Sequence, residues 1–430
     1  MTPATRRLLE RRGRLLGEKA SLFYDEPVHI VRGEGVWLTD ADGKRYLDAY
    51  NNVAHVGHCH PRVVEALCRQ AGLLNTHTRY LHTAILDYVE RLTATFGGNL
   101  ASAILTCTGS EANDVALRIA QAGTKRTGVI ATDSTYHGNT ASVSQLSTRM
   151  PPIGGHAPYI RLVRAPDSYR APDPGRAEEQ FVADVAEAVD SLQKAGHGVS
   201  ALILCPLLAN EGLPDLRPGF FDPAIQIVRE AGGLVIADEV QVGFGRSGSH
   251  FWGHQCAAFT PDIVTLGKPM GNGHPIAGVV TSPELLSRFR DAFRYFNTFG
   301  CNPVSCVVAQ AVLDVLEEEQ LVANAANVGK HILDELHRLG DRHSCIGDVR
   351  GRGLFVAVEI VADRSTREAA PELANRIVNT MRADGVLIGK TGIHGNVLKI
   401  RPPMPFSVAN AELLVRTLDA ALDQSVRGGR

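Results

Sequence analysis

Residues 233–246 read GLVIADEVQVGFGR, and this stretch decides the fold. Its first five residues are small or apolar, which predicts a strand buried on both faces of a largely parallel sheet. Asp238 and Glu239 follow directly, so they stand where this strand ends. Ligands of open α/β sheets bind outside the carboxyl ends of the strands. The stretch therefore predicts a ligand site at Asp238, although the same carboxylate would also suit a helix N-cap.

The same pattern repeats on both sides of this stretch. Short apolar segments alternate with helical ones between Pro61 and Phe299, which is typical of a parallel sheet covered by helices on both faces. Helices are expected at Ser110–Gln121 and Phe181–Ala195. The expected strands are Ser102–Thr106, Gly128–Thr132, Tyr159–Val163, Ala201–Cys205, Gly233–Ala237, Ile263–Leu266 and Gly278–Thr281.

Outside this region the pattern predicts shorter, mixed elements. A hairpin is expected around the Asp-Gly turn at 40–43, and a long helical stretch at 302–340. Three strands and two further helices follow, which indicates a smaller α+β lobe. A chain of 430 residues also exceeds what one simple core encloses.

Lys268 is the second candidate. Lysine is scarce, because only eight of the 44 basic residues are lysines. Lys268 follows the apolar segment 262–267 and precedes a turn-rich one. A lysine desolvated in such a place has a lowered pKa and becomes a nucleophilic amine, whereas a surface lysine would extend its ammonium group into water.

The third candidate is the segment 106–113, TCTGSEAN, which follows a strand and opens a helix. The backbone N–H groups of Gly109, Ser110 and Glu111 at a helix N-terminus can bind an anion such as a phosphate. A lysine amine, a carboxylate at a strand end and a phosphate-binding helix start together point to pyridoxal 5′-phosphate. Lys268 would hold the aldehyde carbon, and Asp238 would keep the ring nitrogen protonated.

The chain here resembles the class III aminotransferase family of fold type I pyridoxal-phosphate enzymes. The resemblance rests on segments 57–61 (GHCHP), 108–113 (TGSEAN), 136–138 (YHG), 237–246 (ADEVQVGFGR), 267–268 (GK) and 299–300 (FG). It implies an α/β fold with a large doubly wound, mostly parallel sheet domain and a smaller α+β domain from both termini. It also implies a homodimer with shared active sites.

The resemblance implies three domain segments and a cofactor site. Residues 1–60 would join the small domain, 61–300 would form the large cofactor domain, and 301–430 the C-terminal small domain. Lys268 and Asp238 would be the catalytic residues, and Thr298 would reach the cofactor phosphate of the neighbouring subunit. The implied cofactor-binding residues are Gly109, Ser110, Tyr136, His137, Asp238, Val240, Gln241, Lys268 and Thr298. Among them, Tyr136 and Val240 would lie on the two faces of the ring, and Gln241 would reach its phenolic oxygen.

Five further segments look like the ethanolamine-phosphate and phosphohydroxylysine phospho-lyases, which eliminate phosphate rather than exchange an amino group: 51–61, 74–82, 296–300, 347–351 and 398–404. Asn139 stands where related aminotransferases carry an arginine for the substrate carboxylate, and a substrate without that carboxylate needs no such partner. The implied residues for the substrate phosphate are Asn51, Arg79, His82, Lys399 and Arg401.

Other readings stay open at this point. The segment 205–217 departs from the phospho-lyase pattern, so the substrate could instead be an aminophosphonate or a longer phosphorylated amine. Transamination to a keto acid uses the same catalytic residues. A catalytically silent scaffold would lack bound cofactor.

Composition limits the partners and the location. A net charge of −2 argues against nucleic acid or an anionic membrane, and a small phosphorylated amine is the expected partner. Eight cysteines without a CxxC pair favour a reducing cytoplasm. The arginine-rich start is expected to be a first helix rather than a mitochondrial presequence. No metal is expected, because consecutive residues such as His58, Cys59 and His60 rarely converge on one ion.

Overall fold

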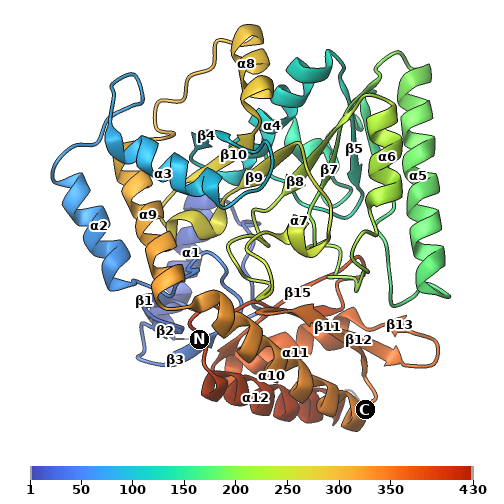
Figure 1. Ribbon diagram of the computed structural model, residues 1–430. Coiled ribbons are helices and arrows are strands. Elements are labelled where there is room, and N and C mark those ends of the chain that lie inside the picture. Colours follow the sequence, from blue (N-terminus) through green and yellow to red (C-terminus); the bar gives the residue numbers. More distant parts are fainter. Residues whose placement is uncertain (1, 428–430) are drawn as a thin grey trace.

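A computed structural model describes residues 2–427 and contains a large seven-stranded sheet (Figure 1). All of its neighbouring strands are parallel except at β10, which runs antiparallel to both neighbours. The order across the sheet is β4 (Ser102–Thr106), β10 (Ala277–Thr281), β9 (Ile263–Leu266), β8 (Leu234–Asp238), β7 (Val199–Leu204), β5 (Gly128–Thr132) and β6 (Ile160–Val163).

Helices cover both faces of this sheet, and alternating side chains explain why. On β8, Val235 and Ala237 pack into one apolar core, whereas Ile236 packs into another core on the opposite face. Two faces that are both apolar must both be covered. The expected doubly wound α/β architecture is therefore confirmed. The helices of this lobe are α2 (Pro61–Ala71), α3 (Thr83–Ala94), α4 (Gly109–Thr124), α5 (Pro174–Lys194), α6 (Asp222–Glu230), α7 (Gly253–Cys256), α8 (Pro283–Ala292) and α9 (Pro303–Glu318).

A smaller lobe lies below the large sheet in Figure 1 and is built from both ends of the chain. The parallel pairing of Val386 with Leu47 joins the C-terminal half to the N-terminal strands. One sheet contains β1 (Ile30–Glu34), β2 (Trp37–Asp40), β3 (Arg45–Asp48) and β14 (Val386–Leu387). The other contains β11 (Ile346–Arg352), β12 (Phe355–Asp363), β13 (Glu368–Ala369), β15 (Gly389–Thr391) and β16 (Val397–Ile400), with helices α10 (Leu321–Arg342), α11 (Pro371–Ala383) and α12 (Val408–Arg427) nearby.

The helical stretch expected at 302–340 is two helices, and they belong to different surroundings. Helix α9 packs against α2 and α3 of the large lobe, whereas α10 packs against β11 of the small lobe. The domain boundaries remain predictions. Residues 1 and 428–430, which end the first and last expected segments, lie outside the described residues.

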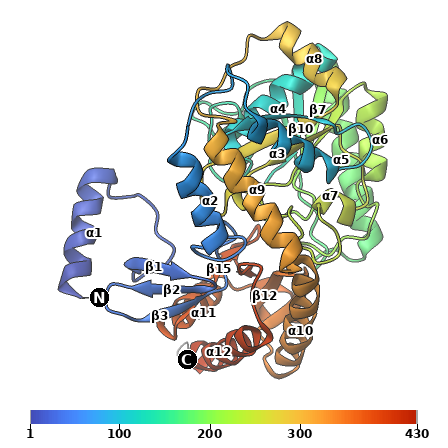
Figure 2. The same ribbon diagram turned by 60° about the vertical axis from the view of Figure 1, so that its left-hand side comes forward.

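The arginine-rich start forms helix α1 (Pro3–Leu16), which has no buried residue and stands apart from the two lobes in Figure 2. Thr2 caps it, since its side chain accepts the backbone N–H of Thr5 at 3.3 Å. Within residues 2–427, none of the helices is both long and apolar enough to cross a membrane.

Candidate active site

Asp238 ends strand β8, and its carboxylate is held from several sides. Its Oδ2 accepts from His137 Nδ1 at 2.6 Å and from Asn113 Nδ2 at 3.0 Å. The backbone N–H of Val240 donates to its Oδ1 at 3.0 Å. Only 5% of the residue is exposed. A buried carboxylate with this many donors is held in one orientation, as the partner of a protonated ring nitrogen must be.

Asn113 is part of this arrangement, and the sequence prediction gave it no role. Its Nδ2 also donates to the carbonyl of His137 at 2.7 Å, while its Oδ1 accepts from Thr265 Oγ1 at 2.7 Å. Asn113 therefore connects α4, β9 and the end of β8. A sequence signal existed, because residue 113 lies on the same helix face as Gly109, four positions earlier.

Lys268 follows strand β9 and opens a short 3₁₀ turn, Lys268–Gly271. Burial, followed by the positive charge of Arg401, lowers the pKa of its amine. A lowered pKa increases the neutral, nucleophilic fraction at physiological pH. Lys268 lines the same cavity as Asp238.

Helix α4 leaves its first N–H groups available at this cavity. Thr108 and Glu111 form a capping box, in which Thr108 Oγ1 accepts the N–H of Glu111 at 3.2 Å. The Glu111 carboxylate accepts the N–H groups of Cys107 and Thr108 at 2.8 and 3.0 Å. The N–H of Glu111, predicted as part of the anion site, is therefore used within the helix cap. The N–H groups of Gly109 and Ser110 remain for an anion, which the helix dipole also favours.

Glycines keep this cavity open. A Cβ on Gly109 would lie 3.0 Å from Val240 Cγ1, and one on Gly138 would lie 2.6 Å from Ser110 Oγ. The cavity, of about 130 Å³, is lined by Gly109, Ser110, Tyr136, His137, Gly138, Cys205, Asn210, Asp238, Val240, Gln241 and Lys268. A fixed carboxylate, an activated amine and an anion-binding helix start on one glycine-lined cavity fit pyridoxal 5′-phosphate. Every residue predicted for the cofactor lines it except Thr298, which is exposed.

Lys399 and Arg401 lie on strand β16 and just beyond it, and both are buried, with 3% and 5% exposed. Lys399 Nζ donates to the carbonyl of Ala209 at 2.7 Å and to Gln241 Oε1 at 3.2 Å. Arg401 donates through Nη1 to the same Gln241 oxygen and through Nε to the carbonyl of Tyr50 at 3.3 Å. Burial and Arg401 lower the pKa of Lys399 well below its usual range.

A second buried arginine holds the surroundings of Arg401 together. Arg246 donates to the carbonyl of Pro402 at 2.7 Å and to His55 Nδ1 at 3.0 Å. His55 Nε2 in turn donates to the carbonyl of Phe244 at 2.8 Å. Three segments around the cavity thus meet at Arg246, and sequence reasoning assigned it no separate role.

The other residues predicted for the substrate phosphate contact groups outside this cavity. The Asn51 side chain accepts the N–H of Val53 at 3.1 Å within its own turn. Arg79 is exposed, and its guanidinium lies 4.0 Å from the centre of the Phe296 ring. His82 precedes α3 and is partly buried. None of the five residues lines the cavity itself. Lys399 and Arg401 reach it through their hydrogen bonds to Gln241, which does line it.

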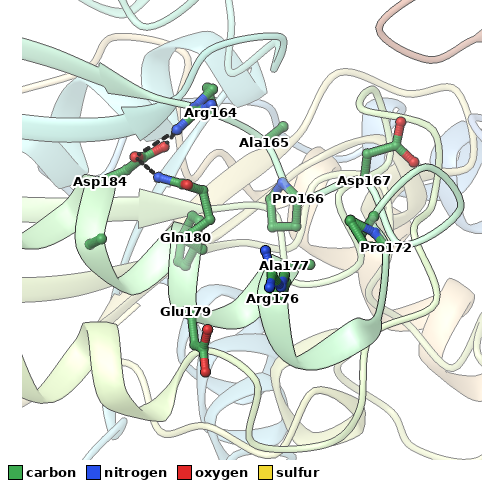
Figure 3. Close-up of a pocket in the computed structure, with 13 residues that line it drawn as sticks. Arg164, Ala165, Pro166, Asp167, Pro172, Arg176, Ala177, Glu179, Gln180 and Asp184 are labelled. Atoms are coloured by element: carbon green, nitrogen blue, oxygen red, sulfur yellow. Dashed lines mark hydrogen bonds and ion pairs between the residues drawn. The ribbon is translucent and has the colours of Figure 1, made fainter.

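Two other candidates do not form a comparable site. A larger hollow of about 700 Å³ lies between α5 and the segment 164–172 (Figure 3), but its Arg164 and Gln180 both bind Asp184, at 3.0 and 2.7 Å. His58 and His60 contact Asp48 and Glu319 separately. No group of three metal-binding side chains occurs in the part of the chain that the structure describes.

Comparisons with known proteins agree with this geometry. The aminotransferase class-III family model matches residues 23–422. A Drosophila melanogaster protein named alanine–glyoxylate aminotransferase 2-like is 42% identical, over 94% of this chain and 84% of its own length. A Caenorhabditis elegans ethanolamine-phosphate phospho-lyase homolog is 35% identical, over 96% and 93%. The structure of an Arthrobacter phospholyase in complex with phosphoethanolamine superposes with a TM-score of 0.94, at 46% identity, over 97% of this chain and 99% of that one.

Proposed function

Because the chain belongs to the class-III aminotransferase family of pyridoxal-phosphate enzymes, we propose that it is a phospho-lyase. Its substrate is a phosphorylated amine such as O-phosphoethanolamine, which it converts with water into acetaldehyde, phosphate and ammonia. The likeness to the Arthrobacter phospholyase and to the C. elegans homolog supports this choice within the family.

The observation that carries the proposal is the pair Lys399 and Arg401. Both side chains are buried beside the cavity. Among residues 2–427, their hydrogen bonds go to carbonyl and amide oxygens and not to a carboxylate. Buried cations are normally paired, because an isolated buried charge is costly. A phosphate group would supply the missing negative charge, and a guanidinium is well suited to bind it.

In the proposed reaction, Lys268 Nζ removes a proton from the carbon that bears the amine. Pyridoxal phosphate, when bound, supplies the carbonyl carbon that takes the substrate amine and the electron sink that makes this proton acidic. Asp238 holds the ring nitrogen protonated. The carbon–oxygen bond at the next carbon breaks, and its electron pair leaves with the phosphate. Lys399 and Arg401 stabilise the charge that develops on this leaving group. Hydrolysis of the released product yields the aldehyde and ammonia.

Transamination is the second candidate, and the 42% identity to a protein named as an aminotransferase favours it. It needs the same Lys268 and Asp238, but it returns the proton to the cofactor and requires a keto acid. The residue at position 139 speaks against it, because Asn139 stands where related aminotransferases carry an arginine for the substrate carboxylate, and it bonds Ser110 Oγ through its backbone N–H at 3.2 Å.

We also propose that the enzyme is a homodimer with shared active sites. Its support is an exposed apolar surface around Phe296, where the His77 and Phe296 rings lie 5.6 Å apart and Leu81 is fully exposed. A patch of this kind marks an interface. Arg79 and the exposed Thr298 belong to the same surface, so a second copy would receive them near its own cavity.

The test mixes the cofactor-loaded protein with O-phosphoethanolamine and no keto acid, and follows inorganic phosphate. We expect phosphate release over many turnovers. Amine transfer to pyruvate without phosphate release would instead make the protein an aminotransferase. Sedimentation of the same sample tests the dimer, and a monomer that turns over substrate would contradict the shared sites.

A further inference from the structure

Asn210 lines the cavity and has no part in the proposed reaction so far. It lies in the loop 205–213 that follows strand β7, within the segment that departs from the phospho-lyase pattern. The backbone of this loop is strained, because Leu208 and Leu213 have φ angles of 46° and 52°, in the left-handed region. Strained backbone persists only where the surrounding structure holds it, and it is frequent at ligand-binding sites.

Side chains from several segments hold the backbone of Asn210 in place. Its N–H donates to Glu211 Oε2 at 3.0 Å, and the other oxygen of this carboxylate accepts from Thr132 Oγ1 at 2.7 Å. Its carbonyl accepts from Arg149 Nη2, and from Thr391 Oγ1 at 2.9 Å. Since both backbone groups of Asn210 are bonded, the loop presents its side chain at one fixed place on the cavity wall.

The buried cations determine which end of the Asn210 amide is left for a ligand. Lys399 Nζ can only donate, and it donates to Gln241 Oε1 at 3.2 Å and to Asn210 Oδ1 at 3.4 Å. Gln241 therefore directs its Nε2 to Asn210, and this group donates to the same Oδ1 at 3.2 Å. A reversed Asn210 amide would place a donor against two donors. Its Nδ2 is thus the free end, and it donates to no acceptor within residues 2–427.

This arrangement is compatible with a bound cofactor. The implied role of Gln241 is at the phenolic oxygen of the cofactor, and the amide nitrogen of a glutamine carries two hydrogen atoms. One hydrogen serves that oxygen while the other stays on Asn210 Oδ1. The Nδ2 donor of Asn210 therefore remains available to the substrate in the cofactor-loaded enzyme.

We infer that Asn210 binds the anionic group of the substrate through Nδ2, beside Lys399 and Arg401. The inference rests on the proposed function for the identity of that group, a phosphate. Asn210 supplies a donor on the cavity wall itself, whereas the two cations lie behind that wall. A hydrogen bond to a charged oxygen is stronger than one between neutral groups. Asn210 thereby determines how the substrate is oriented before its carbon–oxygen bond breaks.

Two substitutions test the Nδ2 donor. Asn210→Asp keeps the shape of the side chain and its acceptor contacts, but it replaces the donor with a charged acceptor. We expect the Kd of inorganic phosphate to rise at least about tenfold. Asn210→Ala removes the donor and the acceptor together. Loss of a donor to a charged group should raise the Kd about tenfold, whereas loss of a mere acceptor for Lys399 would free that cation and lower the Kd.

The measurement is calorimetric titration of inorganic phosphate into the cofactor-loaded enzyme, in a buffer without other polyvalent anions. The bound cofactor occupies its own phosphate site, so the titrated phosphate reports on the substrate site. Asn99→Asp is the matched control, because Asn99 is exposed between α3 and β4, does not line the cavity and gains the same charge. Its Kd should equal that of the wild type. The visible absorbance of bound cofactor verifies that each variant is folded and loaded.

An unchanged or lower Kd in Asn210→Ala overturns the inference, and so does a wild type that binds no phosphate. An unchanged Kd in Asn210→Asp overturns it too, even if Asn210→Ala fails to fold. A changed cofactor absorbance with the phosphate Kd of the wild type would assign Asn210 to the cofactor instead.

Calorimetry involves no turnover, so the two proposals can fail separately. Weaker phosphate binding by both variants, without phosphate release from O-phosphoethanolamine by the wild type, would keep the anion contact and remove the lyase. Phosphate release by the wild type, with unchanged Kd values in the variants, would do the reverse.

Discussion

The residues around Asp238, here called the cofactor end of the site, and those around Lys399 and Arg401, called the cation end, are built in different ways. At the cofactor end, the charge of Asp238 is met by three donors from His137, Asn113 and the backbone. At the other end, Lys399 and Arg401 meet only neutral oxygens. The first arrangement is complete without a ligand other than the cofactor. The second lacks one charged group, and that group has to come from the substrate.

This difference separates general chemistry from substrate choice. Proton transfer at Lys268 and the fixed carboxylate of Asp238 serve both elimination and transamination. The unpaired cations matter only for a substrate that carries an anionic group. Substitutions at the cofactor end should therefore impair every reaction, whereas those at the cation end should impair the binding of substrates that carry an anionic group.

The largest effect is expected at Lys268. Lys268→Ala removes the amine that holds the cofactor and moves the proton, so phosphate release should fall by about four orders of magnitude. Amine transfer should fall with it. Rate assays of both reactions test this, with the exposed Lys390→Ala as the control that keeps activity. Loss of only one reaction would contradict a shared proton-transfer group.

Asp238→Asn keeps the shape of the side chain and removes its charge. The rate constant kcat should fall about 100-fold to 1,000-fold, because the ring nitrogen loses its counter-charge. The KM for O-phosphoethanolamine should change little, since Asp238 does not face the substrate phosphate. A variant with unchanged kcat would show that the carboxylate is only a structural residue.

Lys399→Met tests the cation end of the site. Removing one of the two cations should raise the KM for O-phosphoethanolamine about 100-fold. The visible absorbance of the bound cofactor should stay that of the wild type, because the Asp238 end is intact. Steady-state kinetics and an absorbance spectrum measure both. If the variant loses cofactor while the enzyme that remains loaded keeps its KM, Lys399 serves the cofactor and not the substrate phosphate, which contradicts the assignment of the two ends.

Asn113→Ala should have a smaller effect, because it removes one of three donors to Asp238. We expect a decrease in kcat of about tenfold, the size of one hydrogen bond to a charged group. The pH at which the absorbance of the bound cofactor changes should also shift, since the Asp238 carboxylate is less firmly held. A lower unfolding temperature with a normal spectrum and kcat would make Asn113 a purely structural residue.

The smallest predicted effect is on pH dependence. Burial lowers the pKa of Lys399 in the free enzyme, and a bound dianion favours its charged form and raises that pKa. Affinity is therefore highest below the lowered pKa and falls as pH rises through it, so the KM should increase several-fold on the alkaline side. The substrate phosphate itself has a pKa of about 6, and the measured KM values are corrected for this titration. A KM that falls with rising pH, or the same pH dependence in Lys399→Met, would contradict this.

The cofactor end was predictable from the sequence because its residues follow strands and open a helix. Strand β4 has the predicted bounds, Ser102–Thr106, and β8 ends one residue later than expected, at Asp238 itself. Parallel strands bring their carboxyl ends to one edge, so Asp238 and Lys268 had to lie close together. The fold class and the cofactor follow from this pattern, and the family match agrees with both.

The cation end was predictable only in part, since its contacts join distant segments. Gln241 and Lys399 are 158 positions apart, and no local pattern indicates that their side chains meet. Arg79 and His82 were grouped with them through resemblance alone, and the structure places Arg79 on an exposed surface against Phe296. Residues that would act in a neighbouring subunit cannot be recognised from the periodicity of one chain.

The measurement that tests the central claim most directly supplies O-phosphoethanolamine and pyruvate together to the cofactor-loaded enzyme and quantifies four products. If Lys399 and Arg401 direct the elimination of phosphate, the products are equal amounts of phosphate, ammonia and acetaldehyde, with no alanine. Alanine equal to the amine consumed, with the phosphate still attached to carbon, would show that Lys399 and Arg401 do not direct a leaving group and that the enzyme is an aminotransferase.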